Sequence, residues 1–318
     1  MKNSVSVVIP NYNGENIIVQ TISFAIEALK TSHLSSFEII VSDDASTDQS
    51  ISVIKESFEE VIIVESEINT GFSGNVNRGV KIATKELILI LNSDLHLEKD
   101  YFNSLLPMFE NKRVFGVMGS IKDPLTFDFQ DGAKLPILKF NVFISSNKNR
   151  FSKSKILPTF FLSGANALVR RDYFLQLDGF CELFNPYYSE DVDLGIRAWR
   201  MGWELYFQPK AICYHDISTT IKKISKEKVA KTAKRNKYIL HSLHLPRFWL
   251  IFYDLNLILI TLFRMISGEQ LYFQALKSYF GLKKEIRKER FKFFNLNEKQ
   301  KKLSLTEVIN KIKSLDLH

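Results

Sequence analysis

The strongest constraint on the fold is a regular alternation of two sequence patterns over residues 5–91. Short apolar runs with the length and branching of buried strands occur at 5–9, 37–41, 61–64 and 87–91. Apolar residues at helical spacing lie between them, at 15–30, 46–58 and 74–84. This order predicts an α/β fold with a Rossmann-like, mainly parallel sheet and helices on both faces.

The loops that follow these strands are the candidate site, because ligands of such sheets bind beyond the carboxyl ends of the strands. All four loops are polar: Asn11-Tyr12-Asn13, Asp43-Asp44, Asn69-Thr70-Gly71 and Asn92-Ser93-Asp94.

Asp43 and Asp44 allow two interpretations. Adjacent acids before a Ser- and Thr-rich helix start can cap that helix by accepting backbone N–H bonds. In a ligand crevice, a carboxylate can instead accept the imide N–H of a uracil or thymine ring. Their position at the end of a strand favours the second interpretation.

Asn92-Ser93-Asp94 emerges at the same predicted edge of the sheet. Oxygen ligands hold Mg²⁺ or Mn²⁺, and such an ion can neutralise a departing diphosphate, so Asp94 is a candidate metal ligand. The alternative is a turn facing solvent, for which this composition is also suitable.

Glu190-Asp191-Val192-Asp193 begins a predicted helix at about 191–203. Acids at a helix N-terminus are stabilised by the helix dipole without any catalytic role. Displacement at a sugar's anomeric carbon, however, requires a carboxylate base on the face opposite the leaving group. His215 follows a strand-like run, and a single His is more often structural than a metal ligand.

The chain divides into two electrostatic parts. Residues 1–217 hold 21 Lys and Arg against 27 Asp and Glu, whereas 218–318 hold 22 against 8. We expect a front domain over 1–217, with a nucleotide-binding half at 1–100 and an acceptor half at 101–217. Within the acceptor half, 114–160 predicts short strands and a mobile loop near 145–156.

The basic part, 218–318, is predicted to be a helical extension. Its apolar run at 248–263 is short for a membrane span and contains Asp254. A helix lying in the plane of a membrane or facing a partner fits this pattern better than a spanning one, and an ordinary core helix is the alternative. The sequence shows no recognisable nucleic-acid-binding module, so we expect the basic part to bind an anionic membrane surface and not a nucleic acid.

Two further features bear on location. Cys181 and Cys213 lack CxxC spacing and are expected to be buried thiols in a reducing compartment. The apolar run at 5–9 is too short and too early for a signal peptide. A cytoplasmic location, at the inner face of the plasma membrane, is therefore expected.

Five motifs in order resemble family 2 glycosyltransferases of the GT-A fold: residues 5–13, Asp43-Asp44-Ala45-Ser46-Thr47-Asp48, Asn69-Thr70-Gly71-Phe72, Leu91-Asn92-Ser93-Asp94 and residues 190–197. The stretch 71–79 looks most like the bacterial rhamnosyltransferase-like branch that builds surface polysaccharides. Each motif is weak by itself, and five in order across 1–217 are specific.

The resemblance implies a role for each site residue. Pro10, Tyr12 and Asp44 would line the base pocket, and Asp43, Gly71, Asn77, Asn92 and Gly164 would belong to the same donor-binding side. Asp94 and His215 would hold Mg²⁺ or Mn²⁺. Asp191 would be the catalytic base, with Glu190 on the acceptor side.

Two positions depart from or extend this pattern. Asn92 is neutral where the family's DxD element begins with an acid, and His96 is a further candidate ligand, although a position facing water is favoured for it.

The expected function is inverting, metal-dependent transfer of a sugar from a UDP- or dTDP-type donor to a hydroxyl of a saccharide or lipid-linked saccharide. A non-catalytic protein that binds nucleotide sugars or assists assembly is the alternative. A dehydrogenase or nucleotidyltransferase is disfavoured, since no Gly-rich phosphate loop follows the first strand.

Overall fold

The predicted alternation is present in the computed structural model, which describes residues 3–139, 143–146, 149–215, 225–296 and 301–317. Four strands form its parallel region in the order β3-β2-β1-β4: β1 (Ser4–Asn11), β2 (Ser36–Asp43), β3 (Ile62–Glu65) and β4 (Leu87–Leu91). The intervening helices are α1 (Ile18–Lys30), α2 (Ser50–Ser57) and α3 (Gly71–Ile82). The predicted α/β class is thus confirmed.

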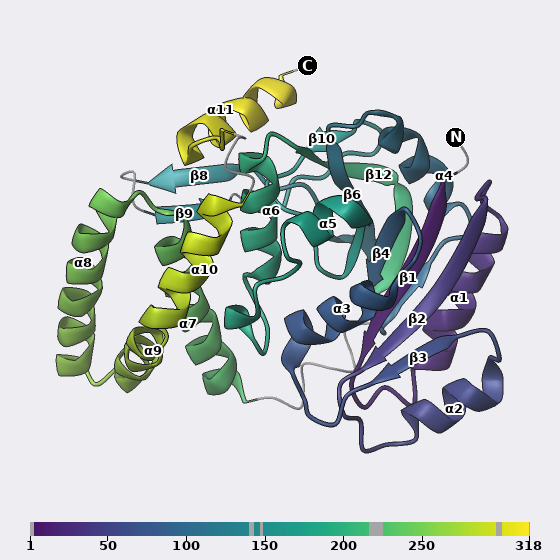
Figure 1. Cartoon of the computed structure of the whole chain (residues 1–318), viewed down its shortest axis with the longest axis horizontal. Helices are drawn as coiled ribbons and strands as arrows, with labels where there is room; N and C mark the ends of the chain where they lie inside the picture. Colours follow the sequence, from purple (N-terminus) through teal and green to yellow (C-terminus); the bar gives the residue numbers. More distant parts are fainter. Residues whose placement is uncertain (1–2, 140–142, 147–148, 216–224, 297–300, 318) are drawn as a thin grey trace.

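Alternation along the strands explains the layers. In β1, Val7 belongs to one hydrophobic cluster with α1, whereas Val8 belongs to a second cluster with α3. Successive strand residues point to opposite faces, so an apolar run buries both faces of the sheet. The helices therefore cover the sheet on both sides (Figure 1).

The second half of the front domain extends the same sheet with mixed strand directions. β11 (Asn166–Arg170) runs antiparallel between β4 and β6 (Val114–Lys122), and β12 (Glu204–His215) lies parallel to β6. Three short strands complete the edge: β5 (Leu95–Leu97), β7 (Phe129–Asp131) and β10 (Leu157–Pro158). The helical segments here are α4 (Tyr101–Leu105), η1 (Leu106–Glu110), α5 (Arg171–Gln176), η2 (Glu182–Phe184) and α6 (Glu190–Arg200).

Two sequence predictions need adjustment. The segment 114–160 begins with a nine-residue strand deep in the sheet, β6, followed by a hairpin of β8 (Pro136–Lys139) and β9 (Phe143–Ser146). Of the loop predicted near 145–156, residues 147–148 lie outside the described residues. Helix α2 begins at Ser50, later than predicted, because the Asp48 carboxylate accepts hydrogen bonds from both the N–H and the hydroxyl of Ser50.

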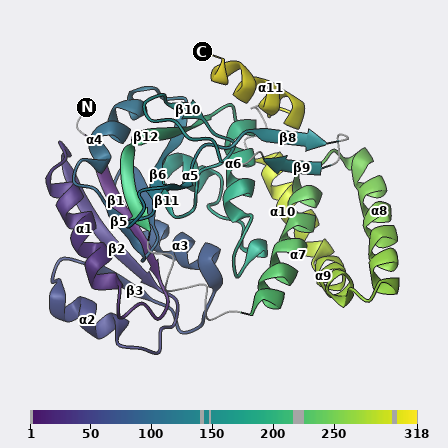
Figure 2. The same cartoon turned by 180° about the vertical axis from the view of Figure 1, so that it is seen from behind.

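The C-terminal part is helical, as predicted: α7 (Lys226–His244), α8 (Arg247–Ile266), α9 (Gln270–Gly281), α10 (Lys283–Asn295) and α11 (Leu305–Asp316). Figures 1 and 2 show α7 to α10 gathered at the opposite end of the molecule from α1 and α2, with α11 returning over the front domain. Ile239 of α7 and Val308 of α11 share a hydrophobic cluster with Trp199 of α6. The predicted boundary at 217 lies outside the described residues.

Helix α8 is mostly exposed. Among the described residues it is the one helix long and apolar enough to cross a membrane, and 17% of its apolar window is buried. The buried stripe, Tyr253, Leu257 and Thr261, faces inward, and Asp254 accepts from Lys283 at 2.7 Å. The core-helix interpretation of residues 248–263 is therefore wrong.

Both cysteines are free thiols. Cys213 is buried as expected, whereas Cys181 is only partly buried, so the expectation of two buried thiols holds for one of them.

Candidate active site

The loop after β2 is built around Asp43. Its carboxylate accepts hydrogen bonds from the Asn11 side chain at 2.8 Å and from the Ser46 hydroxyl and N–H at 2.6 and 2.9 Å. Asp43 is 2% exposed. These bonds join the carboxyl ends of β1 and β2, so Asp43 shapes the loop predicted to hold the donor.

Asp44 performs a similar task for the loop that begins α3. It accepts from the Thr70 N–H and hydroxyl, from the Gly71 N–H at 2.8 Å, and from the Arg78 guanidinium at 3.1 Å. A carboxylate has about four acceptor positions, so all are engaged within the protein. Arg78, which the sequence analysis did not single out, is therefore part of this loop's framework.

Pro10, Tyr12 and Gly71 lie around this framework. Pro10 is the second-last residue of β1, and Tyr12 follows the strand with 54% of its surface exposed, so its ring can contact a ligand. Gly71 has a φ of +75°, and a Cβ there would lie 3.0 Å from the Pro186 Cα. Glycine is thus required both by its conformation and by the close approach of the Asn185 side chain and the Pro186 backbone.

The Asn77 side chain binds the segment around Phe180 instead of facing a crevice. Its amide donates to the Phe180 carbonyl at 2.9 Å and accepts from the Phe180 N–H at 2.9 Å. A further bond reaches Glu182 at 3.2 Å. This gives Asn77 a structural role, and its contact with a donor stays a prediction.

Asp94 and His215, the two predicted metal ligands, lie together although 121 residues separate them. Asp94 Oδ2 is 3.2 Å from His215 Nε2, because β5 pairs antiparallel with the end of β12. His215 Nδ1 is 3.0 Å from Gln130 Oε1, and Gln130 Nε2 donates to the His215 carbonyl at 3.2 Å. Since an amide oxygen only accepts, Nδ1 donates to Gln130, and Nε2 is the ring nitrogen that faces Asp94 at hydrogen-bond distance.

This arrangement fits a cation. A carboxylate oxygen and an imidazole nitrogen that face each other are a ligand pair for a divalent ion, and a partner on the far ring nitrogen is usual for metal-binding histidines. Two residues before Asp94 in the chain, Asn92 has a buried side-chain oxygen without a hydrogen-bond partner among the described residues. His96 stacks on Phe24 at 4.7 Å, and no group of three acidic, His or Cys side chains assembles among the described residues.

Glu190 and Asp191 begin α6, beside a small cavity. Asp191 lines that cavity with Gly164, and its Oδ1 accepts from the Val192 N–H at 2.7 Å. Glu190 is 7% exposed, and its Oε2 lacks a hydrogen-bond partner within the described residues.

Burial, and next the Asp191 charge, raises the pKa of Glu190, and burial also raises the pKa of Asp191 against the opposing Lys134 charge. Lys134, which sequence analysis missed, is held by Asp131 and by the Gly132 carbonyl.

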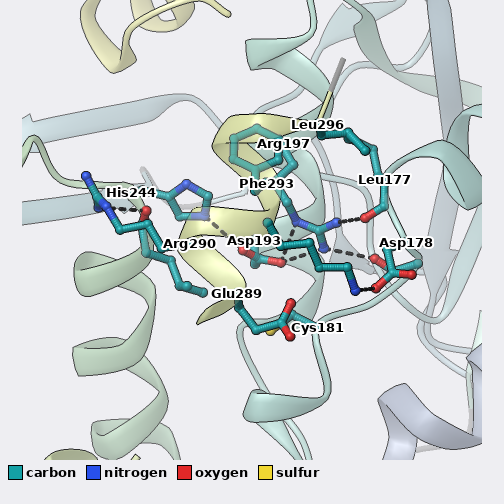
Figure 3. A pocket seen from close by; sticks show the side chains of 13 residues that line it. Leu177, Asp178, Cys181, Asp193, Arg197, His244, Glu289, Arg290, Phe293 and Leu296 are labelled. Carbon is teal, nitrogen blue, oxygen red and sulfur yellow. Dashed lines mark hydrogen bonds and ion pairs between the residues drawn. The ribbon is translucent and has the colours of Figure 1, made fainter. Parts of the chain in front are cut away.

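Asp193, the third acid of this motif, is structural. Figure 3 shows its carboxylate between Arg197 and His244, with bonds of 2.6 and 2.9 Å. Burial raises the pKa of Asp193, but the Arg197 charge and the His244 bond more than offset this and lower it. Burial lowers the pKa of His244 to about 4, so the imidazole is neutral and donates from Nε2.

A residue of α7 fixes the loop that leads into α6. The Asn236 amide is fully buried and donates to the carbonyls of Phe184, Tyr187 and Tyr188 at 2.6, 2.9 and 2.8 Å. Tyr188 and Ser189, next to Glu190, both have φ of +77°. Asn236 therefore stabilises an unfavourable backbone conformation directly before the two acids.

The predicted site residues follow one edge of the sheet. A continuous set of contacts runs from Asp44 to Gly71, from Phe72 to Pro186 and Gly164, and from Asn92 to Ala165. Gly164 shares its cavity with Asp191. These contacts connect Asp44, Asn92 and Asp191 through the loops that contain Gly71 and Gly164.

The family model described as "Glycosyl transferase family 2" matches residues 6–177, more than half of the chain. The poly(ribitol-phosphate) beta-glucosyltransferase of Bacillus spizizenii is 36% identical over 104 residues, which cover 31% of this chain and 15% of that protein. The N-acetylglucosaminyl-diphospho-decaprenol L-rhamnosyltransferase of Mycobacterium tuberculosis is 24% identical over 202 residues, covering 56% of this chain and 66% of that one. The match thus spans less than two thirds of either relative.

Among solved structures, GalNAc-T7 with UDP, GalNAc and Mn²⁺ superposes with a TM-score of 0.70 at 16% identity, over 98% of this chain and 57% of the other. This similarity confirms the GT-A fold. With the family model, it settles the classification predicted from the motifs: the chain belongs to glycosyl transferase family 2.

Proposed function

We propose that the protein transfers a sugar from a UDP- or dTDP-type nucleotide sugar to a hydroxyl group of a saccharide or lipid-linked saccharide, in bacterial surface polysaccharide synthesis, with inversion at the anomeric carbon. The observation that carries this proposal is the contact between Asp94 and His215, supported by the contacts that link nearby Asn92, through Ala165 and Gly164, to the cavity beside Asp191. GalNAc-T7, which shares the fold, was solved with UDP and Mn²⁺.

Asp94 and His215 would hold the divalent ion, Mg²⁺ or Mn²⁺, with the Asn92 oxygen close to it in the chain. When bound, such an ion neutralises negative charge on the leaving diphosphate. Gln130 orients the His215 ring through Nδ1, so that Nε2 would be the nitrogen that binds the ion. Two protein ligands leave most positions for donor oxygens and water, as is usual for Mg²⁺ and Mn²⁺ bound with substrate phosphates.

Asp191 would be the base. Its Oδ1 already accepts from Val192, so Oδ2 is the oxygen left to take the proton of the acceptor hydroxyl. A raised pKa strengthens a carboxylate as a proton acceptor. Burial and the Asp191 charge keep Glu190 protonated to higher pH than usual, so Glu190 would donate a hydrogen bond on the acceptor side while Asp191 stays ionised.

The donor base would lie against Pro10 and Tyr12. For Asp44 to accept a ring N–H, one of its present partners must give way, and Arg78 is the one on a flexible side chain. Asp43, Gly71, Asn77 and Gly164 would act through the shape of the loops, because the contacts of each fix backbone around the crevice.

The protein would bind its acceptor at the surface of a membrane. The exposed apolar side of α8 and the surplus of Lys and Arg in 218–318 together fit an anionic membrane surface. The rhamnosyltransferase relative is named for an acceptor on a diphospho-decaprenol lipid. Location at the inner face of the plasma membrane belongs to the same proposal, as does the absence of a nucleic-acid partner.

Nucleoside diphosphate release from UDP- and dTDP-sugars with Mn²⁺ tests the chemistry. Asp191→Asn should lower turnover by about 10²–10⁴-fold, the usual contribution of a general base, without lowering the thermal midpoint. Asp172→Asn, an equal change at a 90% exposed carboxylate, is the control. Wild-type protein that binds nucleotide sugar but releases no diphosphate with metal would instead support the non-catalytic alternative.

A further inference from the structure

A pocket between α8 and α10 is lined by three arginines. Arg247 begins α8, and Arg287 and Arg290 lie one turn apart on α10. The remaining lining residues are Leu250, Phe291, Phe294 and Asn295, around a cavity of about 640 Å³. This volume is within the range of ligand sites, about 300–1,000 Å³.

The three guanidinium groups are not neutralised. No carboxylate of the described chain lies within 4.0 Å of Arg247, Arg287 or Arg290. Arg290 is held in place, since it donates to the Ser242 and Leu243 carbonyls at 2.8 and 2.9 Å. Burial, and next the charge of Arg247, lowers the pKa of Arg290, so an anion in the pocket would relieve repulsion between cations.

The pocket lies at the N-terminal end of α8, a helix whose surface is largely apolar and exposed. Phe248 and Ile251, both 65% exposed, lie within the first five residues of the helix, and Phe291, which lines the pocket, is 67% exposed. Ile266 at the far end is 88% exposed, and the 20 residues of α8 extend about 30 Å. Cations and apolar side chains therefore meet at the N-terminal end of α8.

This combination selects the ligand chemistry. A nucleic acid would neutralise the arginines but leave Phe248, Ile251 and Phe291 exposed to water. A neutral apolar partner would bury these side chains but leave the arginines unpaired. A phosphate group attached to hydrocarbon satisfies both, because guanidinium groups bind phosphate oxygens and alkyl chains cover the apolar side chains.

We propose that Arg247, Arg287 and Arg290 form a binding site for the phosphate group of an anionic membrane lipid, with Phe248, Ile251 and Phe291 entering the hydrocarbon beside it. The proposal deepens the membrane part of the proposed function and rests on it. It gives α8 an orientation at the membrane, with its N-terminal end fixed to the headgroups.

Vesicle binding by the full chain tests the site. The wild type should bind phosphatidylcholine vesicles that contain phosphatidylglycerol much more tightly than vesicles without it. Arg247→Gln with Arg287→Gln removes two exposed cations and leaves Arg290 to support the backbone. Lys284→Gln with Lys288→Gln removes the same charge from other exposed positions of α10 and is the matched control.

Cations that act only through the general field contribute alike, so a defined site should make the arginine variant lose at least about tenfold more affinity than the lysine variant. Phe248→Ser with Ile251→Ser should weaken binding to both kinds of vesicle. Equal losses in the two charge variants would overturn the site, as would equal binding of wild type to both vesicles.

Wild-type binding to neither vesicle would end the membrane part of the proposed function. Metal-dependent diphosphate release by the wild type, measured on the same preparation, reports the chemistry separately from the lipid site.

Discussion

The carboxyl edge of the sheet and the surface of α8 and α10 differ in how far their polar groups are paired. At the edge, Asp43 accepts three hydrogen bonds and Asp44 four, and these bonds join neighbouring loops. Around α8, Arg247 and Arg287 have no acidic partner in the described chain, and large apolar side chains face water. The acidic side chains of the edge are therefore paired within the protein, whereas the arginines and apolar side chains of the helical surface face solvent.

The same comparison separates the framework groups of the edge from the groups that could still contact a ligand. Once the internally paired groups are set aside, Asn92, Asp191 and Glu190 keep acceptor atoms available. A site whose framework is already satisfied holds its remaining groups in place before the ligand arrives, which is the condition for electrostatic catalysis. The following predictions, in decreasing order of effect, test this contrast.

Among the predictions that follow, Asp94→Asn should have the largest effect. Removing the charged metal ligand should lower diphosphate release by about 10²–10³-fold, as for the loss of one strong transition-state interaction. Manganese binding, followed by spin resonance without donor, should weaken in parallel. Unchanged manganese affinity in Asp94→Asn would exclude Asp94 as a ligand.

Gln130→Leu should weaken metal affinity by about 10–100-fold, because the His215 ring loses the partner that orients it.

Acid should destabilise the junction between α6 and α7. The pKa of His244 is about 4 in the folded protein against 6.5 for the free side chain, so the unfolded chain takes up the proton first as pH falls. The free energy of unfolding contributed by this group is full above about pH 6.5 and decreases by about 3 kcal/mol by about pH 4.

Glu190 and Asp191 act in the opposite direction, because their raised pKa values favour protonation of the folded state. The measurement is therefore the difference between wild type and His244→Gln in urea unfolding at several pH values. A glutamine can still donate to Asp193. A pH-independent difference would contradict the assignment.

Asn236→Ala should affect both halves of the molecule at once. It leaves three loop carbonyls without their donor and should cost about 2 kcal/mol of unfolding free energy. Turnover should fall by at least about tenfold, since Glu190 and Asp191 lose a fixed backbone. Asn256→Ala, at an exposed position of α8, serves as the comparison. A stability loss with unchanged turnover would limit Asn236 to folding.

Ile266→Ser should have the smallest effect in solution. At 88% exposure the side chain loses almost no packing, so the unfolding free energy should change by less than about 0.5 kcal/mol. A larger decrease would show that the exposed surface of α8 is stabilised within the protein, and the contrast with the sheet edge would fail.

The sequence predicted the strand and helix order well because periodicity reports burial directly. Strand β6 was harder to predict, since Gly116 and Gly119 interrupt its apolar run. The structure shows why they are there: a Cβ at Gly116 would lie 2.6 Å from Leu162, and one at Gly119 would lie 2.4 Å from the Ala211 carbonyl. These glycines permit close packing, whereas in a sequence they indicate a turn.

The site was predicted in part. The family resemblance placed Asp94, His215 and Asp191, and the structure brings the first two into contact. Gln130 and Asn236 were not predicted, because their partners lie 85 and about 50 residues away and no local pattern marks such pairs. Asp193 illustrates the converse, since its position in an acidic motif hid a structural role.

The hydrogen bonds from α7 also limit how proteins of this architecture can be recombined. A chimera that joined residues 1–217 to the C-terminal helices of another protein would inherit the loop before Glu190 without Asn236. It would also inherit Asp193 without the imidazole that donates to it. Exchanging acceptor preference by swapping whole halves would therefore fail unless both donors were grafted along with them.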